Sequence, residues 1–142
     1  MKILSIIIPA YNEEKYISQI LDQIQSVDTE IIGFMKEIIV VDDGSTDRTR
    51  QVAEDHGVEH IVRFGWNQGL ARAFSAGLEK SLREGADVIV NIDADNQYNA
   101  DDIPKLTQPI LDKKAEYVVG ERPIGDIEHF PASKKLLQKL GS

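Results

Sequence analysis

The chain contains no cysteine among its 142 residues. This excludes a disulfide framework, a metal site built on thiolates and a cysteine nucleophile. The sequence also lacks any run of about 18 consecutive apolar residues, the length that a membrane-spanning helix needs. Its opening apolar stretch, residues 3–9, is too short for such a helix or for a signal peptide. We therefore expect this segment to be soluble and cytoplasmic.

Positive charge is scarce as well. The chain has 24 acidic against 16 basic side chains, which gives a formal net charge of −8. Such a surface repels polyanions, so we expect no nucleic-acid partner. Acidic side chains gathered in a loop can instead hold a divalent cation. The length and a hydrophobic fraction of 42% fit one globular domain, and we predict a single domain over residues 1–142.

Short β-branched runs alternate with amphipathic stretches along the chain. The runs predict buried strands, at residues 3–8, 37–41, 59–64, 87–92 and 115–119. The stretches predict helices, at residues 14–24, from about 46 to 56, 67–83 and 101–111. Asn12 is the expected N-cap of the first helix, and Ser45 or Thr46 that of the second. Continuous apolar strands that alternate with helices indicate an α/β fold with a mostly parallel central sheet flanked by helices.

Polar residues gather in the segments that follow the predicted strands. Ligands of parallel sheets bind beyond the carboxyl ends of the strands, so these segments are the expected binding region. Four of them carry polar chemistry: residues 9–13, 42–47, 93–98 and 120–125.

The sharpest motif is Asp93-Ala94-Asp95, directly after a predicted buried strand. Two carboxylates two residues apart reach one point if the chain bends there. Oxygen ligands of this kind suit Mg²⁺ or Mn²⁺, which in turn bind diphosphate oxygens. The alternative is a solvated acidic turn or a helix cap.

Two further segments fit a nucleoside. In Asp42-Asp43-Gly44-Ser45 a carboxylate at a strand end can accept hydrogen bonds from a base or a ribose, whereas the alternative is a β-turn before a capped helix. In the segment after the first strand, Tyr11 can stack on a base and Glu13 can bond to it. The alternative there is a plain strand-to-helix turn capped by Asn12.

Basic side chains near the same edge fit phosphate. Asn67-Gln68-Gly69 opens a helix whose N-terminus favours an anion, and Arg72 adds positive charge there. Arg122 follows the fifth predicted strand and can grip a phosphate with two hydrogen bonds. The alternative for both arginines is a solvent-facing side chain. The histidines show no metal-ligand spacing, and we expect His56 and His60 to be structural.

Taken together and in this order, the motifs resemble those of the family 2 glycosyltransferases with the GT-A fold. The matching stretches are residues 6–13, 40–47, 67–69 and 91–97, and the resemblance spans residues 3 to about 122. The segment Asp93-Ala94-Asp95-Asn96-Gln97 is similar to the D-A-D-x-Q of the dolichol-phosphate mannosyltransferase-like branch.

The resemblance implies a role for each matching residue. The nucleotide sugar, UDP- or GDP-linked, would be held by Pro9, Tyr11, Glu13, Asp42, Asp43, Arg72, Asp93 and Ala94. Asp93, Asp95 and Gln97 would bind the Mg²⁺ or Mn²⁺ cofactor and the diphosphate. Asp95, Gln97 and Arg122 would be the catalytic residues. The implied reaction moves the sugar, with inversion, to a polyprenyl phosphate.

The sequence departs from that branch in two ways. Tyr98-Asn99-Ala100 stands where the branch has His-Pro-Pro, which bears on the acceptor and the sugar. Family members also continue beyond a length of this kind, so we expect an N-terminal portion of a longer protein, with membrane contact through the C-terminal part at the cytoplasmic face. Residues 134–140 fit an amphipathic helix on a membrane, or a plain surface helix.

Other functions stay open at this point. A saccharide hydroxyl acceptor would need an Asp or Glu base, for which Asp126 and Glu128 are candidates. A nucleotide-sugar-binding module without turnover is a second alternative. A dinucleotide-dependent oxidoreductase is disfavoured because no G-x-G-x-x-G follows the first strand. A sugar nucleotidyltransferase is disfavoured because residues 9–13 are neither glycine-rich nor basic.

Overall fold

The computed structural model describes residues 1–95, 99–116 and 118 of the chain. It divides into two compact units, residues 1–103 and 104–142. The first unit holds the sheet and the candidate site. Of the second unit, the described part is mainly α4 (Ile103–Leu111) and the turn after it.

The first unit is built on a parallel sheet. Its strands are β1 (Lys2–Ala10), β2 (Phe34–Asp42), β3 (His60–Arg63) and β4 (Val88–Asn91), in the order β3-β2-β1-β4. Every neighbouring pair is parallel. The predicted α/β class with a mostly parallel sheet is therefore confirmed, and the first four predicted strands correspond to these four.

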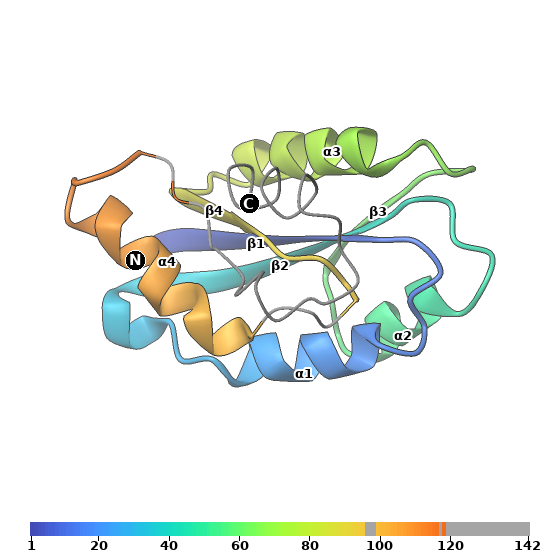
Figure 1. Ribbon diagram of the computed structural model, residues 1–142, viewed down its shortest axis with the longest axis horizontal. Coiled ribbons are helices and arrows are strands. Elements are labelled where there is room, and N and C mark those ends of the chain that lie inside the picture. Colours follow the sequence, from blue (N-terminus) through green and yellow to red (C-terminus); the bar gives the residue numbers. More distant parts are fainter. Residues whose placement is uncertain (96–98, 117, 119–142) are drawn as a thin grey trace, which may run out of the picture. The chain divides into compact units, whose positions relative to one another are not determined.

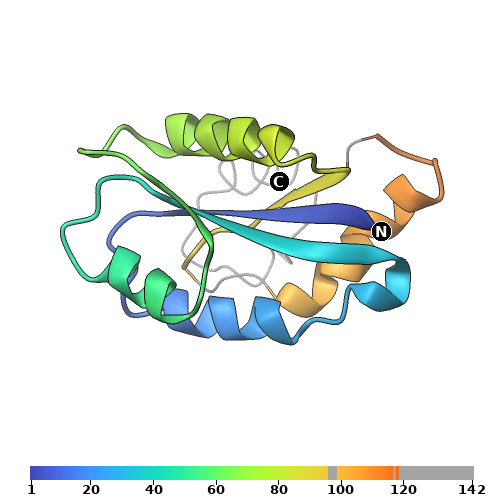
Figure 2. The same cartoon turned by 180° about the vertical axis from the view of Figure 1, so that it is seen from behind.

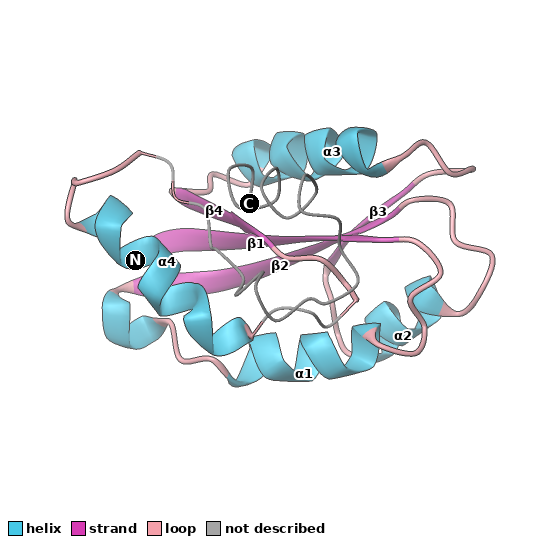
Figure 3. Ribbon diagram, viewed as in Figure 1, coloured by secondary structure: helices cyan, strands magenta, loops and turns pink. Residues whose placement is uncertain are grey.

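The helices cover both faces of this sheet. In Figures 1 and 2, α1 (Ile17–Ser26) and α2 (Thr49–Asp55) lie on one face, and α3 (Leu70–Arg83) lies on the other. The strand order explains this division. The crossovers through α1 and α2 step in one direction along the sheet and the crossover through α3 steps back, so right-handed connections put α3 on the opposite face. Figure 3 shows the two helical layers with the strands between them.

Side-chain alternation divides the core into two layers. On the α3 side, Ile7, Ile39 and Val41 pack with Ala73 of α3. On the other side, α1 buries its apolar stripe: Ile17, Ile20, Leu21 and Ile24. Two short 3₁₀ helices complete the unit: η1 (Glu30–Ile32), between α1 and β2, and η2 (Ala100–Asp102), after β4.

Gly77 marks the closest approach of α3 to the sheet. A Cβ at this position would lie 2.4 Å from Cγ2 of Ile7, which is too close for two carbon atoms. One turn further along α3, Ser81 is buried and its hydroxyl lies 2.7 Å from that of Ser5 on β1. Small residues at these two positions let α3 lie directly on β1.

α3 begins at Leu70 and not at residue 67, and the predicted starts of α1 and α2 are wrong as well. α1 begins at Ile17 and not at residue 14, and no side chain caps it. α2 begins at Thr49, where the backbone N–H donates to Oδ1 of Asp47 at 2.9 Å, so neither Ser45 nor Thr46 is the cap. The errors at α1 and α2 come from side chains that are used for contacts elsewhere in the fold, as described below.

The fifth predicted strand, residues 115–119, lies partly outside the described residues. Of its five residues the structure describes Ala115, Glu116 and Val118, and assigns none of these three to a strand. The helix predicted at residues 101–111 is present, as η2 followed by α4.

Candidate nucleotide-sugar site

A cleft of about 430 Å³ lies at the carboxyl ends of the strands. That volume falls within the range of roughly 300–1,000 Å³ of small-molecule sites. Its walls come from four places: the end of β1 and the segment after it, the residue after β2, the start of α3 with the segment before it, and the segment after β4. The lining residues are Pro9, Ala10, Tyr11, Glu13, Asp43, Asn67, Gly69, Leu70, Ala73, Asp93, Ala94 and Asp95.

Asp43 ties one wall of the cleft to the sheet. The side chain is only 4% exposed. Its Oδ1 accepts from the backbone N–H of Gln68 at 2.7 Å, and its Oδ2 accepts from the backbone N–H of Gly69 at 3.0 Å. The Nδ2 of Asn67 also donates to Oδ2, at 3.1 Å. One buried carboxylate thus fixes the turn that leads into α3.

Gly44 makes this close approach possible. Its φ is +72°, a left-handed conformation, and a Cβ here would lie 2.2 Å from the backbone carbonyl carbon of Trp66. Only glycine leaves room for the segment before α3 to cross the segment after β2.

Asn12 joins the segment after β1 to the segment after β2. Its Oδ1 accepts from the backbone N–H of Thr46 at 2.8 Å, and its own N–H donates to Oγ of Ser45 at 3.0 Å. The next residue, Glu13, donates its N–H to Oγ1 of Thr49 at 2.8 Å. Asn12 therefore does not cap α1, contrary to the prediction from its position before the helix. It holds Tyr11 and Glu13 at the cleft instead.

Asp42 has a different position from its neighbour. It is 2% exposed and does not line the cleft. Its Oδ1 accepts from the backbone N–H of Ser45 at 3.0 Å, which closes the turn after β2. This bond belongs to the turn that we had weighed as the alternative to a nucleoside contact.

Carboxylates from two segments meet in the cleft. Glu13 comes from the segment after β1, and Asp93 and Asp95 come from the segment after β4. Burial raises the pKa of Glu13, and the negative charges of three aspartates raise it further: Asp95, Asp47 and Asp93. Such mutual repulsion is relieved by a cation, and the donor set consists of hard oxygens. The residues therefore fit the Mg²⁺ or Mn²⁺ that the resemblance implies.

The structure brings most of the predicted site residues together. Those that line the cleft are Pro9, Tyr11, Glu13, Asp43, Asp93, Ala94 and Asp95. Asp42 is buried and does not line the cleft, and Arg72 is exposed on α3 and does not line it either. Gln97 and Arg122 lie outside the described residues.

Two lining residues were not foreseen as part of the site. Leu70 and Ala73 belong to the first turn of α3, and the sequence pattern suggested only an apolar helix face for them. Ala73 is buried in the core and also reaches the cleft, but Leu70 is 63% exposed. Their position directly after Asn67-Gln68-Gly69, at a helix N-terminus near the strand ends, is the sequence feature that could have indicated their place in the site.

Comparison with known proteins identifies relatives of this architecture. The family model described as "Glycosyl transferase family 2" matches residues 5–140. The UDP-N-acetylglucosamine–dolichyl-phosphate N-acetylglucosaminyltransferase of Methanococcus voltae is 34% identical, over 95% of this chain and 59% of its own length. The dolichol-phosphate mannosyltransferase of Pyrococcus furiosus is 33% identical, over 96% of this chain and 38% of its own length.

A solved structure shares the fold. Glucosyl-3-phosphoglycerate synthase from Mycobacterium tuberculosis, in complex with Mn²⁺, UDP and glucosyl-3-phosphoglycerate, superposes with a TM-score of 0.64 at 29% identity. The match covers 78% of this chain and 40% of that one. The present chain thus spans between about two fifths and three fifths of the length of these three proteins.

Replacing Asp43 by Asn tests the anchor of the cleft wall. The amide keeps the size of the side chain but has one accepting oxygen, so it cannot accept all three of the bonds made by Asp43. We expect the free energy of unfolding to fall by about 1–3 kcal/mol. We also expect amide hydrogen exchange at Gln68 and Gly69 to accelerate.

Asp42→Asn is the matched control, since its oxygen can keep the single bond from Ser45. Urea denaturation and exchange measured on both variants check the expectation. An Asp43→Asn variant with unchanged exchange at Gln68 and Gly69 would show that the carboxylate does not fix this turn.

Proposed function

This chain belongs to glycosyl transferase family 2, and we propose that it is an inverting transferase that moves a sugar from a nucleotide diphosphate sugar to a polyprenyl phosphate. The observation that carries the proposal is the cleft at the strand ends, which is lined by one aromatic ring and four carboxylates. The names of the Methanococcus and Pyrococcus relatives support a lipid phosphate acceptor. The Mn²⁺ and UDP bound to the mycobacterial structure support the donor class.

The nucleoside belongs at the β1 side of the cleft. Tyr11 is 45% exposed there, so its ring has a free face on which a uracil or guanine base can stack. Pro9 forms the wall next to it, and Glu13 has a carboxylate that accepts from base or ribose donors. We propose that the base is the uracil of UDP or the guanine of GDP, and we leave the sugar unassigned.

The diphosphate belongs beside Asp93 and Asp95. A bound Mg²⁺ or Mn²⁺ would supply positive charge that neutralises the leaving diphosphate. Asp93 and Asp95 are its proposed ligands in the cleft, and Gln97 is the third. Another wall of the cleft is the start of α3, where Asp43 fixes the backbone at Gly69, and a helix N-terminus favours phosphate. Arg72 and Arg122 are further candidates for phosphate contacts.

The proposed reaction is a single displacement. An oxygen of the acceptor phosphate attacks the anomeric carbon from the face opposite the diphosphate. The bond from that carbon to the diphosphate oxygen breaks, and the nucleoside diphosphate leaves with the electron pair. A lipid phosphate is already anionic at neutral pH, so this acceptor needs no general base, whereas a saccharide hydroxyl does.

The acceptor also bears on where the protein works. Across the part of the chain that the structure describes, we find no helix with the length and apolar character for a membrane span. We propose that the whole protein meets its lipid substrate at the cytoplasmic face of a membrane. The amphipathic segment at residues 134–140, a candidate for that contact, lies outside the described residues.

Transfer of a labelled sugar tests the function directly. The protein is incubated with Mn²⁺, UDP- or GDP-sugars labelled in the sugar, and both a polyprenyl phosphate and a mixture of saccharides as acceptors. We expect label to appear in the organic phase with one donor and to require the lipid phosphate. Label transferred to a saccharide with none in the lipid would contradict the acceptor assignment. A folded chain that binds neither nucleotide would contradict the donor assignment.

Replacing Asp95 by Asn tests the metal site in the cleft. The change keeps the size but removes a charge and weakens an oxygen ligand. We expect affinity for the nucleoside diphosphate in the presence of Mn²⁺ to fall ten- to a hundredfold, about 1–3 kcal/mol. The melting temperature without metal should stay or rise, because the variant relieves repulsion between carboxylates.

Asp55→Asn, the same change on an exposed residue at the end of α2, is the control and should alter neither quantity. Calorimetry and thermal denaturation on the same samples separate binding from folding. A destabilised Asp95→Asn variant with unchanged Mn²⁺-dependent affinity would show that Asp95 serves the turn and not the metal.

A further inference from the structure

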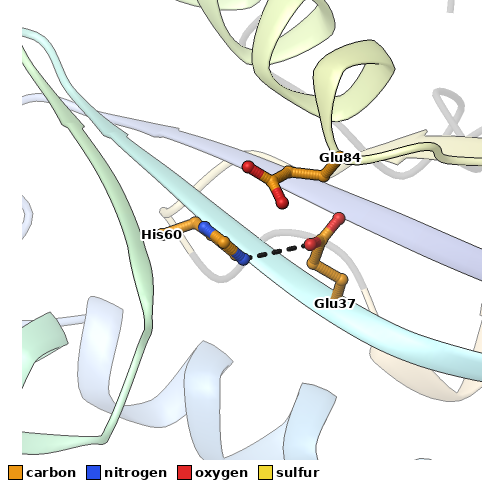
Figure 4. A group of neighbouring side chains, drawn as sticks. All are labelled: Glu37, His60 and Glu84. Carbon is orange, nitrogen blue, oxygen red and sulfur yellow. Dashed lines mark ion pairs between the residues drawn. The ribbon is translucent and has the colours of Figure 1, made fainter.

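A second group of metal-binding side chains lies away from the cleft, at residues that come from three elements. Glu37 lies on β2, His60 begins β3, and Glu84 directly follows α3 (Figure 4). One ligand atom from each residue lies within 4.8 Å of the others. We propose that Glu37, His60 and Glu84 bind a divalent transition-metal ion of the Zn²⁺ type, independently of the nucleotide-sugar site.

One carboxylate oxygen of Glu37 accepts no hydrogen bond from the described residues. Its Oε1 lies 3.0 Å from Nε2 of His60. Its Oε2 is buried and has no hydrogen-bond partner among the described residues. Buried polar atoms are rarely left unpaired in native proteins, because each costs desolvation without compensation. A cation bound between the three side chains would satisfy this oxygen.

The charges around Glu37 also favour a cation. Burial raises the pKa of Glu37, and the negative charge of Glu84 adds to the effect, while His60 and Lys80 oppose it. The hydroxyl of Ser5 is near enough to lower the pKa as well, but it pairs with the hydroxyl of Ser81 at 2.7 Å and does not meet the geometry of a hydrogen bond to Oε2. The Nζ of Lys80 lies 2.6 Å from Oε1 of Glu84 and lowers the pKa of that carboxyl group. Lys80 therefore supplies the charge that now balances Glu84, and a divalent ion would compete with its ammonium group.

The ligand types select the metal. One imidazole nitrogen with two carboxylates suits Zn²⁺ and its first-row neighbours, whereas Mg²⁺ and Ca²⁺ prefer oxygen alone. Tetrahedral Zn²⁺ bonds of 2.0–2.2 Å place ligand atoms about 3.4 Å apart. The ligand atoms lie no more than 4.8 Å apart, so no pair has to approach by more than about 1.4 Å. Glu84, whose side chain is 33% exposed, has the freedom to move by this much. A water would complete the tetrahedron.

This cluster is separate from the cleft. In the β1–β2 register Glu37 lies opposite Ser5, and Asp42 lies opposite Ala10 at the cleft end of the strands. Five residues of strand separate the two levels, or roughly 16 Å at the usual rise per residue. A metal at Glu37 would link β2, the edge strand β3 and the end of α3. We expect the metal to stabilise the edge of the sheet at β3.

Zinc binding by the 142-residue chain tests the proposal. The Asp93→Asn/Asp95→Asn double variant serves as the background, because it weakens the cleft as a competing site. We expect one Zn²⁺ per chain, a rise in melting temperature with Zn²⁺ concentration, and a shift of the His60 imidazole resonances. Mg²⁺ at the same concentration should produce none of these.

Three ligand variants and one control assign the site. We expect each ligand variant to weaken Zn²⁺ affinity at least about tenfold: His60→Gln, Glu37→Gln and Glu84→Gln. Changing a residue that only hydrogen-bonds to a metal ligand already weakens metal binding by about this factor. His56→Gln is the matched control. That histidine is also partly buried, and it pairs with Asp22 at 3.2 Å on the other face of the sheet. Its loss should leave Zn²⁺ affinity unchanged.

Lys80→Gln gives an effect in the opposite direction. Removing the competing ammonium group should strengthen Zn²⁺ binding, while a merely structural Lys80–Glu84 pair would only lose stability. Absence of stoichiometric Zn²⁺ binding by the folded background variant would overturn the proposal. Binding that survives both His60→Gln and Glu84→Gln unchanged would overturn it as well. Glu84 is the safer of these two positions for folding, because it lies at the exposed end of α3. None of these results depends on whether the cleft binds a nucleotide.

Discussion

The parallel pairing of β1 with both of its neighbours places the chemistry of this protein at one edge. In the observed register Ala10 lies beside Asp42, and Ile7 lies beside Asn91. The segments that leave β1, β2 and β4 therefore leave in the same direction. β1 and β2 end at the same level, and β4 ends three residues earlier, beside Ile7. Because β1 is buried on both faces from Leu4 to Ala10, a slip of register would expose apolar residues and is strongly disfavoured. Apolar burial in the sheet thus sets the positions of Tyr11, Asp43 and Asp93.

The sequence predicts this framework well because the strands and helices have local signatures. β-branched runs mark the four described strands, and their alternation with amphipathic stretches requires a two-sided parallel sheet. The helix starts were less predictable. Asn12 has the chemistry of an N-cap, but its partners are the backbone of Thr46 and the hydroxyl of Ser45, more than 30 residues away. Propensity describes what Asn12 does locally and carries no information on such a distant partner.

The same reasoning explains which site residues could be foreseen. The D-x-D after β4 and the aromatic segment after β1 were predicted to meet, and Asp93, Asp95 and Tyr11 line one cleft. The difference between Asp42 and Asp43 was not predicted. Successive side chains of a strand point to opposite faces, so Asp42 meets the turn toward α2 and Asp43 meets the start of α3. To predict that Asp42 and Asp43 have different partners, one must know where α2 and α3 begin. The group of Glu37, His60 and Glu84 shows no spacing pattern, since its members are more than 20 residues apart and meet only in the folded chain.

We propose that the segments after β1, β2 and β4, together with the start of α3, form one site for a nucleoside diphosphate and its cation. The most direct measurement follows the backbone amide resonances of the ¹⁵N-labelled chain during titration with UDP or GDP and Mg²⁺. We expect the largest shifts to gather at the cleft, at Tyr11, Glu13, Asn67, Gly69, Asp93 and Asp95, and a chelator to reverse those at Asp93 and Asp95. Saturable shifts that gather instead around Glu37 and His60, or a folded chain with no shifts at either nucleotide, would contradict the proposal.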